Sequence, residues 1–114
     1  MYAIARTELD MSPGKLAAQC GHAFVDAYER SPPDRKTLYQ SDSHGTKVVL
    51  SGTLQDLLEI EHQCNIRNIP CIRIVDSGHV MPPHFTGDPI ITALGIGPSY
   101  RHEVKFLRSL PLTS

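Results

Sequence analysis

Residues 11–33 read MSPGKLAAQCGHAFVDAYERSPP, and this stretch decides the fold. Ser12 is suited to accept a hydrogen bond from the first free amides of a helix, and Pro13 suits the first helical position. The pair Pro32-Pro33 ends the segment, because proline lacks an amide donor and clashes with the preceding turn. The sequence therefore predicts a helix over residues 13–30.

This helix has two unlike faces when its residues are placed at the helical angle. A narrow polar stripe is formed by Lys15, Gln19, His22 and Asp26. The broad remaining surface is apolar or small and consists of Leu16, Ala17, Ala18, Cys20, Gly21, Ala23, Phe24, Val25, Ala27 and Tyr28. We expect the small residues Ala17, Ala18 and Gly21 to let the helix lie close against a sheet.

Outward from this helix, the chain alternates short apolar runs with helical patterns. Runs rich in β-branched or apolar residues predict strands at residues 2–6, 47–51, 71–75 and 90–96. Helices are predicted at residues 54–67, where Thr53 is the cap, and at residues 100–110. The polar, proline-led segment 31–45 is predicted to be a connection with at most one helical turn.

The order of these elements predicts an α/β fold. Two strand-helix-strand units imply that the first three strands run parallel. The fourth strand follows the helix-free loop 76–89, so we expect it to run antiparallel. The predicted architecture is a three-layer α/β/α arrangement around a four-stranded mixed sheet.

Composition fits one globular domain over residues 1–114, with 40% hydrophobic residues. The chain has 11 Lys+Arg against 12 Asp+Glu, which excludes both a disordered chain and a protein that binds nucleic acid through a strongly basic surface. A polyanion would therefore have to bind to a local group of basic residues. No apolar run approaches the roughly 20 residues of a membrane span, and the first residues lack an export signal. Three cysteines without a Cys-x-x-Cys pair favour reduced thiols, so we expect a cytoplasmic protein.

Candidate functional residues converge on one edge of the predicted sheet. Ligands of open α/β sheets bind beyond the carboxyl ends of the parallel strands. Lys15 opens the helix after the first strand, Asp76 follows the third strand, and Thr92 lies near the start of the antiparallel fourth. Gln19 lies one helical turn after Lys15 and presents its amide on the same face.

These groups suit the hydrolysis of an ester. The helix-start amides, loosened by Gly14, and the Lys15 ammonium would attract a phosphate or stabilise an oxyanion. The Asp76 carboxylate could orient a water molecule or accept its proton, and Thr92 could position that water or a substrate hydroxyl. The structural alternative is that Lys15 is a solvated charge, Asp76 a turn residue and Thr92 a packing residue.

The stretch GKLAAQCGHA, residues 14–23, closely resembles the signature of the second, archaeal and eukaryotic, type of peptidyl-tRNA hydrolase. Similar stretches follow the family's order at residues 6–12, 47–50, 76–78 and 92–98 and cover most of the chain. The resemblance implies an enzyme of the cytoplasm that cleaves the ester between a peptide and the terminal ribose of tRNA. It implies no metal and no organic cofactor.

The resemblance also assigns residues to the site. The family's functional lysine, glutamine, aspartate and threonine fall onto Lys15, Gln19, Asp76 and Thr92. Substrate-binding candidates are Gly14 and His22 beside them and, for tRNA phosphates, Lys47, Arg101, Lys105 and Arg108. We expect Lys47 to lie near the same edge as Lys15.

The chain departs from the family pattern in two places. Residues 79–89 replace a shorter loop that usually contains Thr-Gln and Gly-Ser, which leaves substrate preference open because the loop would border the site. Glu8 stands where an aspartate is common, a change that lengthens the reach of the carboxylate.

Other interpretations stay open at the level of sequence. The chain could be a catalytically idle module that binds tRNA or protein, or an esterase or amidase for small molecules. Members of the family commonly pair, which allows a homodimer, although no stretch identifies an interface. The spacings of His79 and His84, and of Cys20 and His22, match no zinc ligand set, and we expect Cys20 to pack in the core.

Overall fold

The computed structural model describes residues 1–42 and 45–113. Its helices are α1 (Pro13–Arg30), α2 (Pro33–Asp42) and α3 (Leu54–Ile66), with short 3-10 turns η1 (Thr7–Leu9), η2 (Arg101–Glu103) and η3 (Lys105–Ser109). Its strands are β1 (Tyr2–Arg6), β2 (Val48–Gly52), β3 (Cys71–Asp76), β4 (Val80–Met81), β5 (Phe85–Thr86) and β6 (Ile90–Ile96). The predicted helix over residues 13–30 and the four predicted strands are confirmed, two of the strands with small shifts at their ends.

The main sheet has four strands in the order β2-β1-β6-β3. Strand β1 pairs in parallel with β2, whereas β6 runs antiparallel to both β1 and β3. The first three long strands therefore share one direction and the last opposes them, so the predicted mixed sheet of an α/β fold is confirmed. The last strand in sequence lies between β1 and β3.

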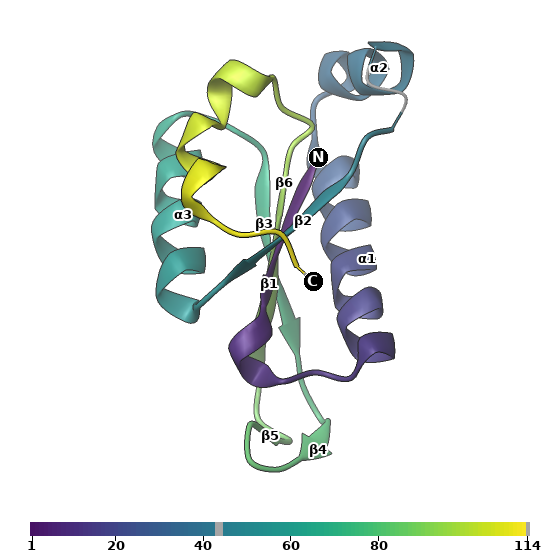
Figure 1. The fold of residues 1–114 in the computed structure, drawn as a ribbon. Coiled ribbons are helices and arrows are strands. Elements are labelled where there is room, and N and C mark those ends of the chain that lie inside the picture. The colour runs from purple at the N-terminus through teal and green to yellow at the C-terminus, as the bar shows by residue number, and fades with distance from the viewer. Residues whose placement is uncertain (43–44, 114) are drawn as a thin grey trace.

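Helices cover the two faces of this sheet, α1 on one and α3 on the other (Figure 1). The α3 face buries large side chains, including Ile4, Leu94 and Ile96. The α1 face buries small ones, among them Ala3, Ala5 and Ala93. Neighbouring strand residues point to opposite faces, so the sequence alternates between these two kinds of side chain.

Small residues do allow α1 to lie close to the sheet, but they are not the ones that the helical spacing predicted. Ala23 and Ala27 are fully buried, whereas Ala17 and Ala18 are exposed and Gly21 has open space around it. At the closest approach, a side-chain carbon on Gly95 would lie 2.2 Å from the Ala23 carbonyl oxygen. The sheet therefore contributes as much to this close packing as the helix does.

Both long helices begin with the caps that the sequence predicts. The Ser12 hydroxyl accepts the Lys15 amide at 3.2 Å. Thr53 and Asp56 form a reciprocal capping box at the start of α3, with the Thr53 hydroxyl accepting the Asp56 amide. Such caps satisfy amides that have no partner within the helix.

Three segments differ from their predictions. Residues 33–42 form the helix α2 instead of a connection with at most one turn, with Pro33 in its first turn and Tyr39 buried against Met1 and Ala27. Residues 100–110 form the two 3-10 turns η2 and η3 instead of one α-helix. Val104, which joins the two turns, and Leu107 of η3 are buried and three residues apart, which matches the period of a 3-10 helix.

The third difference lies in the predicted loop 76–89, where β4 and β5 pair as a small antiparallel hairpin. This hairpin extends the molecule beyond the edge of the main sheet at which α1 begins (Figure 1). None of the helices in the described residues is long and apolar enough to cross a membrane.

Candidate active site

The two ionic side chains of the predicted site meet at the carboxyl edge of the parallel strands. Lys15 lies in the first turn of α1 and Asp76 is the last residue of β3. The Lys15 Nζ atom donates to Asp76 Oδ2 at 2.8 Å, and the two side chains are 16% and 21% exposed. This ion pair is open enough to meet a substrate and sheltered enough to be held in place.

The two uncharged residues of the predicted site form a second pair one turn along α1. The Thr92 hydroxyl donates to Gln19 Oε1 at 2.6 Å, and both residues are buried. This contact directs the Nε2 group of Gln19 away from Thr92, and within residues 1–42 and 45–113 Nε2 makes no hydrogen bond. Gln19 therefore keeps a donor for a substrate oxygen.

A β-bulge in β6 gives Thr92 its direction. Ile74 pairs with Ala93 and Val75 pairs with Ile91, so Thr92 is the extra residue of the longer strand. Simple alternation would place Thr92 on the α3 face with Leu94. Instead, Thr92 contacts Gln19 on the α1 face, beside Ala93. Bulges often re-aim a side chain next to an active site.

The start of α1 offers fewer free amides than the sequence predicts. Pro13 has no amide hydrogen, and the Lys15 amide is already bound to the Ser12 hydroxyl. Among the first three helical residues, this leaves the amide of Gly14, which is exposed. A bound anion would therefore interact mainly with the Lys15 ammonium and this one amide.

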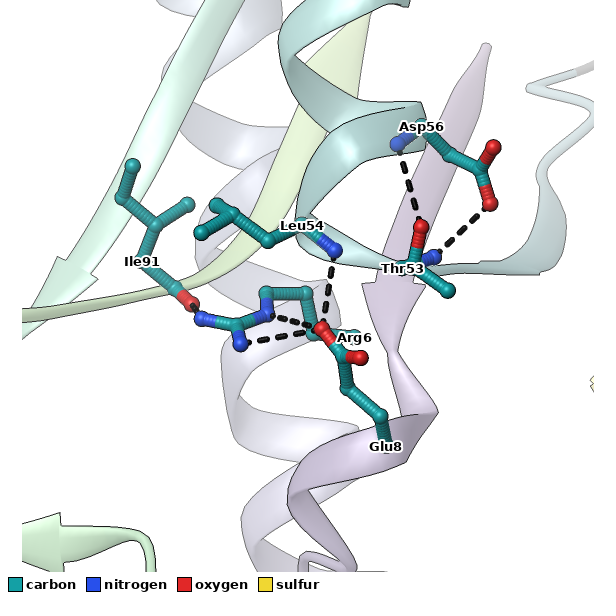
Figure 2. Close-up of polar contacts among 6 residues, drawn as sticks. All are labelled: Arg6, Glu8, Thr53, Leu54, Asp56 and Ile91. Carbon is teal, nitrogen blue, oxygen red and sulfur yellow. Dashed lines mark hydrogen bonds and ion pairs between the residues drawn. The ribbon is translucent and has the colours of Figure 1, made fainter.

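A network around Arg6 and Glu8 fixes the neighbouring part of the edge (Figure 2). Glu8 Oε1 accepts the Leu54 amide at 2.8 Å and the Arg6 Nε group at 2.9 Å. Arg6 Nη1 donates to the Ile91 carbonyl at 2.9 Å, next to Thr92. The Leu54 amide first, and Arg6 after it, hold the pKa of Glu8 below its usual value. The network therefore joins β1, α3 and the start of β6.

No role was predicted for Arg6 from the sequence, and only a longer reach for Glu8. The sequence did contain a sign that Glu8 accepts a helix amide. Glu8 lies just after β1, and the first amides of a helix such as α3 need an acceptor. Its partner could not be identified without the fold, because Leu54 lies 46 residues along the chain.

Phe85 is a second residue near the site that was not predicted from the sequence. It comes from β5, and its ring lies 4.6 Å from the Lys15 Nζ atom. Residues 79–89 were predicted only to border the site as a loop. The sequence offers one sign of this hairpin, because two short runs with strand-forming residues, Val80-Met81 and Phe85-Thr86, lie on either side of the Pro82-Pro83 pair.

Several predicted substrate-binding residues lie elsewhere. Lys47 precedes β2, and Tyr2 pairs with Val48, so Lys47 is at the opposite edge of the sheet from Lys15 and the prediction of a shared edge was wrong. Its Nζ atom donates to the Gly45 carbonyl at 3.0 Å. Arg101 and Lys105 follow β6. Because β6 runs antiparallel to β1, its last residues lie beside the first residues of β1, so Arg101 and Lys105 are at the same far edge as Lys47. His22 is exposed on α1, past Gln19.

The thiol of Cys20 behaves as a structural group. Cys20 is buried against the sheet as predicted, and burial raises the pKa of its thiol. A protonated buried thiol is a poor nucleophile. Across the described residues, no three or more His, Cys, Asp or Glu side chains are grouped so that they could hold a metal ion.

Comparison with known proteins agrees with the sequence resemblance. Residues 1–113 match the family model described as peptidyl-tRNA hydrolase PTH2. A peptidyl-tRNA hydrolase of Methanothermobacter thermautotrophicus is 34% identical over 95 residues, which cover 83% of this chain and 81% of the relative. One from Halobacterium salinarum is 39% identical over 97 residues, with the same coverage of 83% and 81%. One from Methanococcus vannielii is 30% identical over 113 residues, or 96% of this chain and 94% of the relative.

Proposed function

The chain belongs to the peptidyl-tRNA hydrolase PTH2 family, and from that premise we propose how its residues carry out the hydrolysis of peptidyl-tRNA. The observation that supports this mechanism best is the contact of Lys15 with Asp76 beside that of Gln19 with Thr92. These four residues come from α1, β3 and β6, yet they share one sheet edge. One domain of this type over residues 1–114 is part of the proposal, as is a cytoplasmic location.

In the proposed reaction, water attacks the carbonyl carbon of the ester that joins the peptide to the terminal ribose. Asp76 uses Oδ1, which makes no hydrogen bond within the described residues, to orient this water and accept its proton. The bond between the carbonyl carbon and the ribose oxygen then breaks, and the ribose oxygen takes up the proton that Asp76 accepted, so that free tRNA leaves and Asp76 is again ionised. Lys15 lies beside Asp76 and stabilises the negative charge that develops on the carbonyl oxygen.

Gln19 and Thr92 orient the substrate in this proposal. Because the Thr92 hydroxyl donates a hydrogen bond to Gln19 Oε1, the Gln19 amide has one fixed direction and offers Nε2 to the ribose or the carbonyl oxygen. Gly14 is an exposed residue and contributes its amide to the terminal phosphate or to the oxyanion. His22 lies farther along α1, where it borders the bound RNA.

An assay of the purified chain tests this function directly. With an N-blocked aminoacyl-tRNA as substrate, we expect release of free tRNA and inhibition by added uncharged tRNA. A small ester with the same acyl group serves as the control and should react much more slowly, because it lacks the RNA contacts. Absence of turnover with bound tRNA would favour a binding module, and turnover that ignores uncharged tRNA would favour a small-molecule esterase.

Binding of tRNA should weaken as the salt concentration rises. The net charge of −1 means that a few cations must carry the contact with phosphates. We propose two separate contacts: Lys15 at the site, and a patch of Lys47, Arg101 and Lys105 at the opposite edge of the sheet. For about two to four neutralised phosphates, affinity should fall by about tenfold to a hundredfold between 50 and 200 mM salt. Filter binding or fluorescence anisotropy measures this dependence.

Paired variants separate this patch from general electrostatics. Replacing Arg101 and Lys105 together by alanine should reduce the slope of log affinity against log salt by about two. Arg73→Ala is the control, because Glu61 already neutralises that guanidinium at 2.6 Å. An affinity that does not change with salt would contradict the proposed patch. Pairing of two copies stays a prediction from the family resemblance.

A further inference from the structure

Phe85 is buried although it lies outside the apolar core. It is 3% exposed, although it lies in a two-residue strand of a hairpin at the edge of the molecule. Every other residue from Gly78 to Pro89 is exposed or only partly buried. Phe85 belongs to none of the three apolar clusters found in the described residues. The ring must therefore be covered by something other than the core.

The ring is covered in part by the ammonium group of Lys15. Lys15 Nζ lies 4.6 Å from the ring centroid and 2.8 Å from Asp76 Oδ2. The negative face of an aromatic ring attracts a cation, and the attraction grows when the pair is shielded from water. The ammonium is thus held between a carboxylate and a ring, and no hydrogen bond besides the one to Asp76 engages it within the described residues.

The hairpin supports the ring from another side. His79 packs edge-on against Phe85, with the ring centroids 4.9 Å apart and the planes at 80°. The Gly78 amide donates to the Gly87 carbonyl at 2.9 Å and closes the base of the hairpin. His79 Nε2 is buried and makes no hydrogen bond in the part of the chain that is described. His79 therefore contacts Phe85 by packing, without a hydrogen bond at Nε2 to direct it elsewhere.

We propose that Phe85 is a positioning residue of the hydrolase: its ring holds the Lys15 ammonium beside Asp76, in the place where the oxyanion forms. This inference rests on the proposed function. It gives a role to residues 79–89, in which the chain departs from the family pattern. The family's lysine and aspartate are retained here, and the hairpin supplies an aromatic support for the lysine.

Replacement of Phe85 by leucine keeps an apolar side chain but removes the aromatic face. A free Lys15 side chain would sample other positions, so kcat should fall by about 3-fold to 30-fold, the range that a cation–π contact of this kind supports. KM for the tRNA substrate should change by less than about twofold, because Phe85→Leu leaves the charge of Lys15 and the other proposed phosphate contacts in place. Phe85→Tyr retains the ring and should recover most of the lost kcat.

The chain offers a matched control at Phe106. Its ring lies 5.2 Å from the guanidinium carbon of Arg67, and it packs against the α3-side core. Phe106→Leu therefore removes the same kind of cation–aromatic contact, but at Arg67 instead of Lys15. Thermal unfolding of both leucine variants shows whether each is folded, and Phe106→Leu should leave kcat unchanged.

A spectroscopic measurement tests the contact without relying on turnover. Protons on the end of the Lys15 side chain, above the face of the ring, should show an upfield ring-current shift by NMR in the parent and in Phe85→Tyr. This shift should disappear in Phe85→Leu and persist in Phe106→Leu. Absence of the shift in the parent would overturn the contact, whatever the activity.

The two measurements separate failure of the inference from failure of the function. If Lys15→Ala loses activity while folded Phe85→Leu keeps the parent kcat, the hydrolase mechanism stands and the positioning role is wrong. If Phe85→Leu loses kcat and Phe85→Tyr does not recover it although the ring-current shift is present, the positioning role is also wrong. If the parent itself does not turn over peptidyl-tRNA, the proposed function fails, and the positioning role fails with it.

Discussion

Replacement of Asp76 by asparagine is expected to lower kcat for peptidyl-tRNA by about 10²-fold to 10⁴-fold, the contribution expected of a general base. Asparagine has nearly the same shape but cannot accept a proton from water. It also removes the negative charge that holds Lys15 Nζ at 2.8 Å. Affinity for uncharged tRNA should stay nearly constant. Single-turnover kinetics with a labelled N-blocked aminoacyl-tRNA measure the first effect and equilibrium binding measures the second.

Asp88→Asn is the matched control for this experiment. Asp88 lies in the neighbouring segment between β5 and β6 and, within the described residues, accepts only the Thr86 hydroxyl at 3.3 Å. It should leave turnover near the parent value. Lys15→Ala should also lose activity, and the double variant should lose much less than the product of the two effects, because the residues act as a unit. Turnover unchanged in both Asp76→Asn and Lys15→Ala would reject this site.

Replacement of Gly95 by alanine should destabilise the protein by about 3 kcal/mol or more, at the upper end of the range for overpacking. The added carbon would lie 2.2 Å from the carbonyl oxygen and 2.8 Å from the carbonyl carbon of Ala23. Both are backbone atoms, so the whole of α1 must shift away from the sheet. Chemical denaturation, followed by circular dichroism, measures the loss of free energy of unfolding.

A glycine in α1 supplies the opposite control. A side-chain carbon added at Gly21 would meet no atom within 4 Å, so Gly21→Ala should stabilise the protein by about 0.5 to 1 kcal/mol through helix propensity. Gly95→Ala should also reduce activity in the folded fraction, because α1 carries Lys15 and Gln19. Equal stability of the Gly95→Ala and Gly21→Ala variants would show that the close packing of α1 is not a constraint.

The edge of the sheet that carries the site could be predicted, because it follows from the order of strands and helices along the chain. Parallel strands bring the residues after β1 and β3 to one edge, and an antiparallel last strand brings its start there too. Lys15, Asp76 and Thr92 were found in this way. The direction of Thr92 could not be predicted, since alternation alone would turn it toward α3, and the bulge is visible only in the pairing of β3 with β6.

Other differences also have physical causes. The segment 33–42 is polar on most sides and buries few residues, so its apolar periodicity gives little sign of α2. Phe85 looked like one apolar residue in a proline-rich loop, because its partner Lys15 lies 70 positions earlier in the chain and is charged. Spacing rules detect apolar faces and caps, but they do not detect a ring that packs against a distant cation.

The position of β6 has a consequence for synthesis. Strand β6 is the last of the sheet to be translated, yet it lies between β1 and β3 and contributes Thr92. Until it emerges from the ribosome, β1 and β3 lack their shared neighbour, and Lys15 and Asp76 belong to elements that are not yet joined. An unfinished copy is itself a peptide esterified to tRNA. Because β6 lies between β1 and β3 and carries Thr92, a copy without this strand has no assembled site.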